Sequence, residues 1–398
     1  MRSNVMPVSD DASQPGHWSA VAAMSLCVAL LIAAEFMPVS LLTPMATDLG
    51  ASNGMLGLAI SISGLLAVPT SLMMASAGRR LDRRHVLIAL AGLMLVSLVL
   101  MALSSSFAML MLSRALLGVV IGGFWALATA TIMRLVAVES LPKALGLLYT
   151  GNAVATAFAA PLGSYLGGVV GWRGVFWMLV PLVVVNLLWL VASLPSMRAA
   201  APVAGSLRLL RRRHVAFAVS GVMLTFAGAF AAFTYFRPFL ELRTQVSLPQ
   251  LSVLLLVLGL AGFVGTALVS MGLRRHLYPL LRWLPLALAV VTLLLLAVEQ
   301  QFWGVALMLV LWGTLNSAIP VAWSAWISQG TADAPESGGG LMVAAIQMAI
   351  TLGAAWGGWL LDGYSITATF VGSALLLVAA ALLVGNGSRI TPPASVQR

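Results

Sequence analysis

Charged residues are scarce in this chain. Only 8% of its 398 residues are Asp, Glu, Lys or Arg, and 61% are hydrophobic, whereas globular domains carry roughly 25% charged residues. A soluble domain has no way to cover so much apolar surface, so the composition predicts a polytopic membrane protein. Cysteine is nearly absent as well. Cys27 stands alone, which excludes an intramolecular disulfide and a CxxC metal site.

Acidic residues are also few, and the net charge is +10. The basic residues fall mostly in short breaks between apolar segments, where positive charge sets membrane topology. We therefore expect a lipid bilayer as the partner of this chain and no nucleic acid. The four histidines lie at the ends of apolar segments, without the spacing of metal ligands, so we expect neither a metal site nor a cofactor.

Apolar segments long enough to cross a bilayer recur along the whole chain. A bilayer core of about 30 Å requires roughly 20 residues of helix. The candidate spans are 19–42, 55–77, 86–104, 107–133, 144–168, 174–194, 215–236, 251–271, 283–298, 303–327, 339–361 and 366–385. The sequence thus predicts an all-α polytopic membrane protein with twelve transmembrane helices, of which the ninth is short.

The predicted spans fall into two groups of six. The divisions are a cytoplasmic N-terminal tail (1–18), a first six-helix bundle (19–194), a cytoplasmic linker (195–214), a second six-helix bundle (215–385) and a cytoplasmic C-terminal tail (386–398). Similar loops, SAGRRLDRRH and SMGLRRH, follow the second and the eighth span. Such weak internal symmetry is typical of transporters built from repeats, whose substrate sites lie between the halves.

Positive charge is concentrated on one side of the predicted membrane. If the N-terminus is cytoplasmic, the opposite side holds only Arg173, Arg237 and Arg243. Such an asymmetry across many short loops predicts that both termini are cytoplasmic.

Two charged residues lie well inside the predicted spans. Glu35 in the first span and Arg114 in the fourth both lie roughly 10 Å below the outer face, at about 1.5 Å per residue. An ionisable residue at such depth costs about 2.5–3.5 kcal/mol on insertion scales and marks a substrate pathway or a proton relay. Two interpretations remain open. The residues form a static ion pair, or Glu35 is a protonation switch that couples proton entry to substrate exit, with Arg114 as its partner.

Polar and aromatic residues within the spans are candidates for substrate binding. Buried amides need hydrogen-bond partners, and aromatic faces stack on flat rings. An aromatic residue taken singly is more often a packing residue. The candidates are Tyr149, Asn152, Phe230, Tyr235, Asn316, Trp323 and Gln347.

Several motifs resemble the major facilitator superfamily, and within it the drug:proton antiporter branch. The loop GRRLDRR is similar to the family's cytoplasmic motif, LSRALLGVVIGG to its motif in the fourth span, and AAPLGSYLGG to its antiporter motif. His85 and Val86 stand where the family usually has Gly and a basic residue, and Ala160 precedes Pro161 where the family prefers Gly. The resemblance implies two pseudo-symmetric six-helix bundles and proton-coupled export.

The resemblance also implies roles for further residues. Asp82 is expected to face the N-terminus of the eleventh span near Ser337, where a helix dipole favours negative charge; the alternative is a solvated loop charge. The gating candidates are Gly78, Asp82, Arg83 and Arg134. The antiporter-motif candidates, whose glycines allow close helix packing, are Gly151, Pro161, Gly163 and Gly167.

Stretches from both halves are similar to the bacterial purine ribonucleoside efflux pumps: EFMPVSLLTPMATDLG, GGFWALATATIMRLV, LPKAL, FTYFRPF and PVAWSAWI. That similarity implies export of purine ribonucleosides, of the inosine and guanosine type, across a bacterial inner membrane with the proton gradient as energy source. We expect a monomer. Export of drugs, sugars or another small metabolite by the same mechanism is the alternative. An enzyme is disfavoured, because the sequence has no Ser/His/Asp group, HExxH or P-loop. A signalling protein is disfavoured, because the loops between the spans are too short for such a role.

Overall fold

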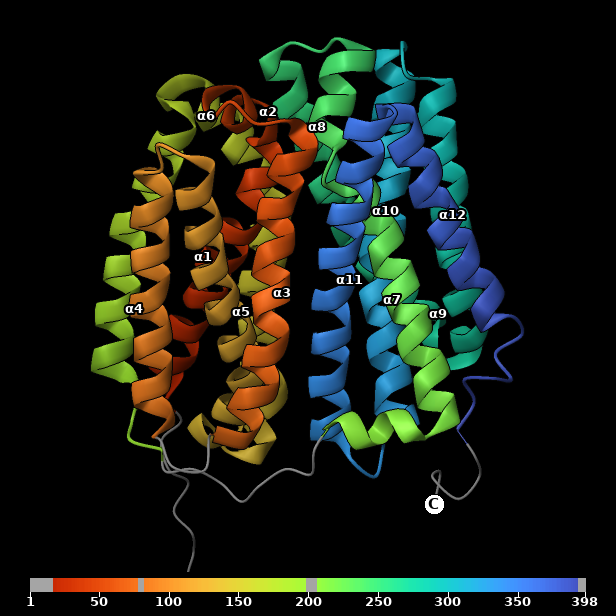
Figure 1. The fold of residues 1–398 in the computed structure, drawn as a ribbon. Coiled ribbons are helices and arrows are strands. Elements are labelled where there is room, and N and C mark those ends of the chain that lie inside the picture. Colours follow the sequence, from red (N-terminus) through yellow and green to blue (C-terminus); the bar gives the residue numbers. More distant parts are fainter. Residues whose placement is uncertain (1–16, 78–81, 198–205, 393–398) are drawn as a thin grey trace, which may run out of the picture.

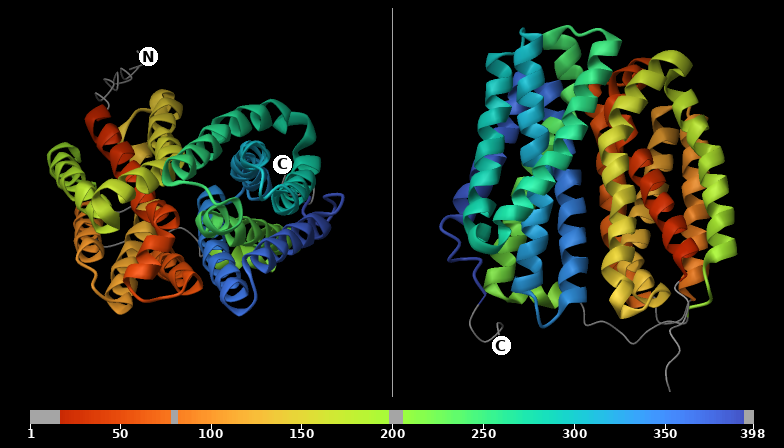
Figure 2. Two further views of the ribbon diagram at one scale, coloured as in Figure 1. Left: turned by 90° about the horizontal axis from the view of Figure 1, so that it is seen from above. Right: turned by 180° about the vertical axis from the view of Figure 1, so that it is seen from behind.

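The computed structural model of the chain describes residues 17–77, 82–197 and 206–392. Gly78, one of the predicted gating residues, lies outside these ranges. Within them the chain forms helices and short connections and no strand. The helices stand in two groups side by side (Figures 1 and 2). The all-α fold predicted from the sequence is confirmed.

The first half contains α1 (Trp18–Ser40), α2 (Leu42–Asp48), α3 (Asn53–Ala77), α4 (Arg83–Ala102), α5 (Phe107–Leu135), a short 3-10 turn (Val138–Ser140) and α6 (Leu141–Ser193). As one straight helix, the 53 residues of α6 would be about 80 Å long, more than twice the thickness of a bilayer core. Gly171 interrupts it with φ 73° and ψ 162°, a conformation that is essentially restricted to glycine. Two spans therefore lie within α6, on either side of Gly171.

The second half contains a 3-10 turn (Ser206–Arg211), α7 (Arg213–Phe233), α8 (Phe236–Phe239), a π turn (Leu240–Thr244), α9 (Leu248–Ala297), α10 (Phe302–Gly330), α11 (Pro335–Gly363) and α12 (Ile366–Val384). α9 contains two spans that meet at His276, where the backbone is not helical. Eleven helical stretches of the described residues are long and apolar enough to cross a membrane. The break at Gly171 makes them twelve spans, as predicted.

The ninth span is longer than the sequence indicated. It covers His276–Ala297, whereas hydropathy alone predicted 283–298. The difference arises at Arg282, where a charge interrupts the apolar pattern but not the helix. Its guanidinium lies over the ring of Trp283, 5.2 Å from the centroid. A long arginine side chain of this kind can cover apolar surface with its methylene groups while its charged end stays in water.

Two pairs of helices make the most extensive contacts between the halves. α3 packs against α11 in the view of Figure 1, and α6 packs against α9 in the view from behind in Figure 2. Between α3 and α11, the Ser61 hydroxyl donates to the carbonyl of Thr351 (2.9 Å), and the Thr351 hydroxyl donates to the carbonyl of Ser61 (3.1 Å). Asp362 near the end of α11 accepts hydrogen bonds from the Ser52 hydroxyl and from the amide of Gly54. These bonds place the contact toward the end where α3 begins.

A small apolar cluster lies in the same interface. Its members, which we call the apolar seal, are Val39 of α1, Ile60 of α3, and Ile350 and Ala354 of α11. All four are almost fully buried. The seal joins the two halves through side chains alone, so it holds only while α1 and α3 stay close to α11.

The contact between α6 and α9 includes a carbonyl that a proline leaves without a helical partner. Pro161 has no amide hydrogen, so the carbonyl of Ala157, one turn earlier in α6, has no helical partner. Gly259 of α9 lies directly against that carbonyl, where a Cβ atom would be only 2.2 Å from the oxygen. The carbonyl that the proline of the predicted antiporter motif leaves without a helical partner thus faces Gly259 of the other half.

The orientation in the membrane remains a prediction, and reporter fusions test it. Reporters placed after Arg213 and after residue 398 are expected to give a cytoplasmic signal, because the basic loops lie on that side. A fusion at Gln245, in the connection before α9, is the matched control and should report the opposite side. A periplasmic signal from either of the first two fusions contradicts the topology.

Candidate transport site

Arg114 is fully buried on α5 and binds the backbones of two neighbouring helices. Its Nη1 donates to the carbonyl of Ala34 on α1, and its Nε donates to the carbonyl of Ala59 on α3, both at 2.9 Å. Its Nη2 donates to the Ser63 hydroxyl at 2.8 Å and lies 3.4 Å from the backbone carbonyl of Glu35. One guanidinium therefore ties three helices of the first half together.

Pro38 explains why α1 offers an acceptor at this point. The proline lies inside α1 and has no amide hydrogen, so the carbonyl of Ala34 has no partner within the helix. Arg114 supplies the missing donor. A charged donor forms a stronger hydrogen bond than a neutral one, so the proline and the arginine together stabilise an irregular backbone at membrane depth.

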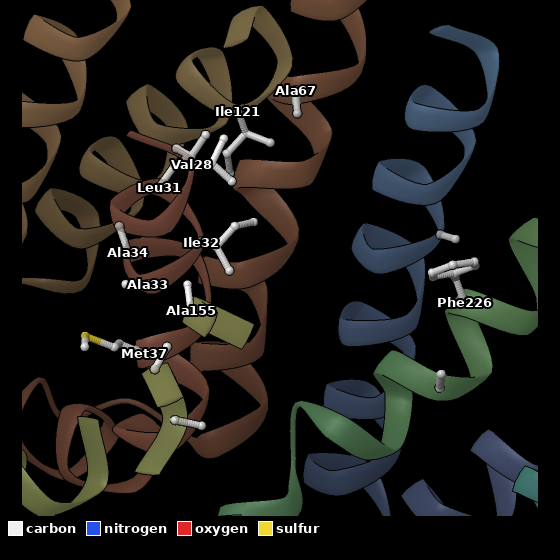
Figure 3. Close-up of a cluster of buried hydrophobic side chains, with 14 of the residues drawn as sticks. Val28, Leu31, Ile32, Ala33, Ala34, Met37, Ala67, Ile121, Ala155 and Phe226 are labelled. Carbon is white, nitrogen blue, oxygen red and sulfur yellow. The ribbon is translucent and has the colours of Figure 1, made fainter. Parts of the chain in front are cut away.

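Glu35 lies beside Arg114 but does not pair with it directly. Its side chain is 4% exposed, and the guanidinium reaches its backbone carbonyl rather than its carboxylate. Figure 3 shows Ala33, Ala34 and Met37 of the same helix turned toward neighbouring helices of the first half, with Phe226 across on α7. The direct ion pair that one interpretation of the sequence requires is not formed in this structure.

The side chain that interacts with the Glu35 carboxylate comes from the other half of the molecule. Gln347 of α11 is 6% exposed, and its carboxamide approaches that carboxylate. The amide nitrogen Nε2 nevertheless makes no hydrogen bond of normal geometry. A buried amide left without a partner costs about 1–3 kcal/mol. The interface between the halves thus holds a buried carboxylate from α1 and a buried carboxamide from α11.

Aromatic rings lie next to this pair. Phe36 follows Glu35 on α1, and its ring centroid is 5.9 Å from that of Phe230 and 6.0 Å from that of Phe233, both on α7. All three rings are half-buried. Phe230 and Phe233 also pack on the apolar seal. The polar pair, the rings and the seal therefore occupy adjacent turns of the same helices.

Two predicted substrate residues are enclosed by packing instead. Tyr235 is fully buried, and its hydroxyl donates to the carbonyl of Ala354 at 2.7 Å. Trp323 is 1% exposed and packs edge-on against Trp326 in the second half. The Tyr235 hydroxyl and the Trp323 ring both contact other residues of the protein, so both residues have a packing role in this structure.

The other predicted substrate residues lie elsewhere on the helices. Tyr149 is exposed and stacks on Trp125, with centroids 6.1 Å apart. Asn152 and Asn316 are half-buried on α6 and α10. No described contact joins these three to Glu35 or Gln347. Of the predicted set, Phe230 and Gln347 are the residues that the structure brings close to Glu35.

The glycines of the predicted antiporter motif face α1. A Cβ atom on Gly151 would lie 2.1 Å from the carbonyl oxygen of Ser25. Equivalent atoms on Gly163 and Gly167 would overlap Ser40 and Leu41. The first span of α6 is therefore in direct backbone contact with the helix that carries Glu35.

Sequence reasoning missed Arg237 as part of the interface. This residue of α8 is 8% exposed, and its Nη1 donates to the carbonyl of Ser40, the last residue of α1. The negative end of a helix dipole favours a cation at this position. Its Nε is paired with Glu241 at 2.7 Å. The sequence signal was an arginine followed by proline at the predicted outer face, with an acid four residues later.

Asp82 has a different partner from the one expected. It caps the N-terminus of α4 by accepting a hydrogen bond from the amide of Arg84 at 2.9 Å. It also accepts from the Ser196 hydroxyl and from the amide of Met197. These bonds, with the Ser196 hydroxyl contributing most, lower the pKa of its carboxyl group from 3.8 to about 2. In this structure Asp82 thus fixes the start of α4 to the segment after α6 rather than binding the start of α11.

The other gating candidates lie near Asp82 or on α5. Arg83 donates from its amide to the carbonyl of Met197 (3.1 Å) and from Nη1 to the carbonyl of Ala130 (2.9 Å). Arg134 lies in the last turn of α5, where a cation interacts favourably with the helix dipole. Their roles in a gate remain predictions.

The two helical halves are joined through α3 with α11 and through α6 with α9, and a buried carboxylate lies between them. This is the arrangement of a membrane transporter of small molecules. A sequence model of the Major Facilitator Superfamily matches residues 24–357. The chain belongs to this family. It is a multi-pass membrane transporter and not an enzyme.

Relatives of similar length are known. The chain is 44% identical to the "Transcription regulatory protein OpdE" of Pseudomonas aeruginosa, over 97% of this chain and 98% of that protein. It is 39% identical to the "Purine ribonucleoside efflux pump NepI" of Salmonella enteritidis PT4, over 96% and 97%.

Solved structures share the fold. A bacterial homologue of the human lysosomal transporter Spinster, in an inward-facing and unoccupied conformation, superposes with a TM-score of 0.75 at 16% identity, over 93% of this chain and 96% of that one. A D-xylose-proton symporter gives 0.74 at 15% identity, over 92% and 97%.

Substitutions of Asp82 separate its capping role from its charge. Asp82→Ala is expected to lower stability by about 1 kcal/mol, whereas Asp82→Asn keeps a capping oxygen and loses less. Because the folded-state pKa is lowered, the charge contributes stability above about pH 4 that is lost as the pH falls toward 2. Thermal unfolding in detergent at pH 7 and at about pH 2 measures both effects. Equal stability of wild type and Asp82→Ala at pH 7 contradicts the capping role.

Arg114→Lys tests the buried guanidinium. An ammonium group cannot serve acceptors on α1 and α3 in the same fork, so buried carbonyls lose partners at about 1–3 kcal/mol each. We expect a large fall in thermal stability of the purified protein. Arg282→Lys, at an edge position, is the matched control and should change little. Wild-type stability of Arg114→Lys excludes the bridging role.

Proposed function

We propose that this protein exports purine ribonucleosides across the bacterial inner membrane in exchange for protons, as a monomer, with the proton gradient as its energy source. The observation that carries the proposal is the Glu35–Gln347 pair, a buried carboxylate and a buried carboxamide that approach each other from opposite halves. The identity of 39% to NepI pumps over 96% of the chain supports the cargo. Export of drugs, sugars or another metabolite is the alternative.

Protonation of Glu35 is the proposed coupling step. When the carboxylate is ionised, its negative charge lies between Arg114 on α5 and Gln347 on α11. Uptake of a proton removes this charge and turns an acceptor-only group into one that also donates. A ligand or proton shifts a conformational equilibrium only by its difference in free energy between the two states. Because Gln347 moves with the second half, the interaction across the interface provides such a difference.

The apolar seal lies close to the polar pair in the interface between the halves. Val39 follows Glu35 by about one turn on α1, and Ile350 follows Gln347 by about one turn on α11. The polar pair therefore lies about one helical turn from the apolar seal. With the predicted orientation, the seal lies on the periplasmic side of the pair, and in this proposal substrate reaches the pair from the cytoplasm.

The name of the Pseudomonas aeruginosa relative refers to transcription. The described residues of this chain form membrane spans and their connections, and no observation among them favours contact with nucleic acid. Transport assays therefore take priority over assays of gene regulation.

Glu35→Gln tests the coupling. Glutamine preserves the shape of the protonated carboxyl group but does not titrate, so the variant should insert normally and fail to accumulate nucleoside against a gradient. Exchange without a gradient should survive. Glu35→Asp should retain partial activity, because a titrating group remains. The measurement is uptake of labelled inosine and guanosine into inverted vesicles, with and without an imposed proton gradient.

Glu139→Gln is the matched control. It makes the same chemical change at an exposed acid outside the spans and should leave accumulation intact. Gradient-driven accumulation by Glu35→Gln at the wild-type rate would exclude Glu35 as the proton carrier. Uptake of arabinose or an ethidium-like cation by the wild type, without uptake of inosine, would favour the alternative cargo.

A further inference from the structure

We propose that the second half binds an anionic phospholipid at the membrane edge, through the guanidinium groups of Arg213 at the start of α7 and Arg389 after α12. The recognised group is the phosphodiester of the lipid headgroup. With the predicted orientation, the site faces the cytoplasmic leaflet. It involves neither Glu35 nor Gln347, so the inference is independent of the proposed cargo.

The two arginines stand beside one aromatic ring. Phe217 lies one turn into α7 and is half-buried, and the guanidinium carbons of Arg213 and Arg389 are each 5.7 Å from its ring centroid. Both arginines are exposed. The ring attracts each cation, but the two like charges repel each other. Among the described side chains, no ion pair joins either arginine to an acid. An anion bound by both cations would relieve that repulsion.

The neighbours of Arg213 hold it in place. Arg212 donates to both carboxylate oxygens of Asp333, at 2.8 and 2.6 Å. The buried ring of His214 lies 3.2 Å from the carbonyl oxygen of Gly330, the last residue of α10. Both flanking residues therefore contact the protein, whereas Arg213 between them is exposed. The fold thus fixes the backbone of this cation at the surface.

Arg389 is fixed in a similar way, although it lies beyond the last helix. The next residue, Ile390, is fully buried. Its carbonyl accepts a hydrogen bond from Nε1 of Trp326 at 3.0 Å, and its amide donates to the carbonyl of Gly387 at 3.1 Å. The segment after α12 is therefore anchored to α10. Two cations whose backbones are already placed lose less conformational freedom when they bind a ligand.

The 3-10 turn before α7 favours a lipid over a free anion. A 3-10 helix has three residues per turn, so residues three apart share a face. Leu207 and Leu210 share one face and are 57% and 38% exposed, whereas Leu209 is buried. Arg208 and Arg211 share another exposed face. Figure 1 shows this turn lying across the lower end of the second half. Exposed leucines beside arginines are typical of a segment that lies in the membrane interface.

The charge of the site selects among lipid headgroups. Clusters of arginine at the cytoplasmic surface attract anionic lipids, so phosphatidylglycerol should bind and phosphatidylcholine, which carries no net charge, should bind at least about fivefold more weakly. The full-length protein is purified in neutral detergent and titrated with each lipid. Native mass spectrometry counts the lipid molecules bound per protein.

Arg213→Gln and Arg389→Gln test the two cations separately. Each should weaken binding of phosphatidylglycerol about fivefold, because a basic residue near a membrane surface contributes roughly that factor. Both side chains are exposed, so thermal unfolding without added lipid should match the wild type and show that the variants are folded. Unchanged lipid affinity in both variants overturns the proposal.

Arg282→Gln is the matched control. It removes the same charge from another arginine on the predicted cytoplasmic side, which lies over the ring of Trp283 alone, and it should leave the affinity unchanged. An equal loss in Arg282→Gln would mean that the lipid responds only to overall positive charge, and would overturn the site. Inorganic phosphate at the lipid's concentration should not displace phosphatidylglycerol. Displacement would assign the site to a free anion and overturn the lipid assignment. The titration contains no nucleoside, so its result is separate from the test of purine export.

Discussion

The Arg114 guanidinium is the interaction on which the first half of the structure depends. Removing an arginine from water into a helical bundle is costly unless its donors are satisfied. Here they meet carbonyl oxygens of α1 and α3 and the Ser63 hydroxyl. One of those carbonyls is available only because Pro38 cannot serve it. The cation thus compensates a break in α1, and α1 in turn is held where its acid faces the second half.

A consequence of this arrangement is that Arg114 does not occupy the Glu35 carboxylate. Had Arg114 formed a fork with the carboxylate, the acid would be a fixed part of a buried pair. Because the guanidinium binds the backbone instead, the field of the cation reaches the acid without occupying its oxygens. The side chain that approaches them, Gln347, belongs to α11. The carboxylate therefore lies between a cation of its own half and an amide of the opposite half.

Hydropathy, loop charge and depth were sufficient to predict the twelve spans and the proximity of Glu35 to Arg114. The exact partners were not predictable, because they depend on backbone irregularities and side-chain directions. The sequence placed Asp82 against α11, whereas the residue caps the adjacent α4 and binds Met197. Tyr235 has the polar tip expected of a ligand contact, yet that tip is bound to a carbonyl of α11. A charge pattern cannot show that Arg237 reaches the end of α1.

The hydrogen bond from Arg237 to the carbonyl of Ser40 affects how easily the two halves separate. Breaking a buried ion pair leaves an uncompensated charge, at about 3–5 kcal/mol, but this arginine keeps Glu241 of its own half as a partner when Ser40 departs. What is lost is a hydrogen bond to a neutral carbonyl. Ser61 and Thr351 likewise exchange only hydroxyl and carbonyl contacts. The two halves can therefore separate at these contacts without leaving the Arg237 charge unpaired.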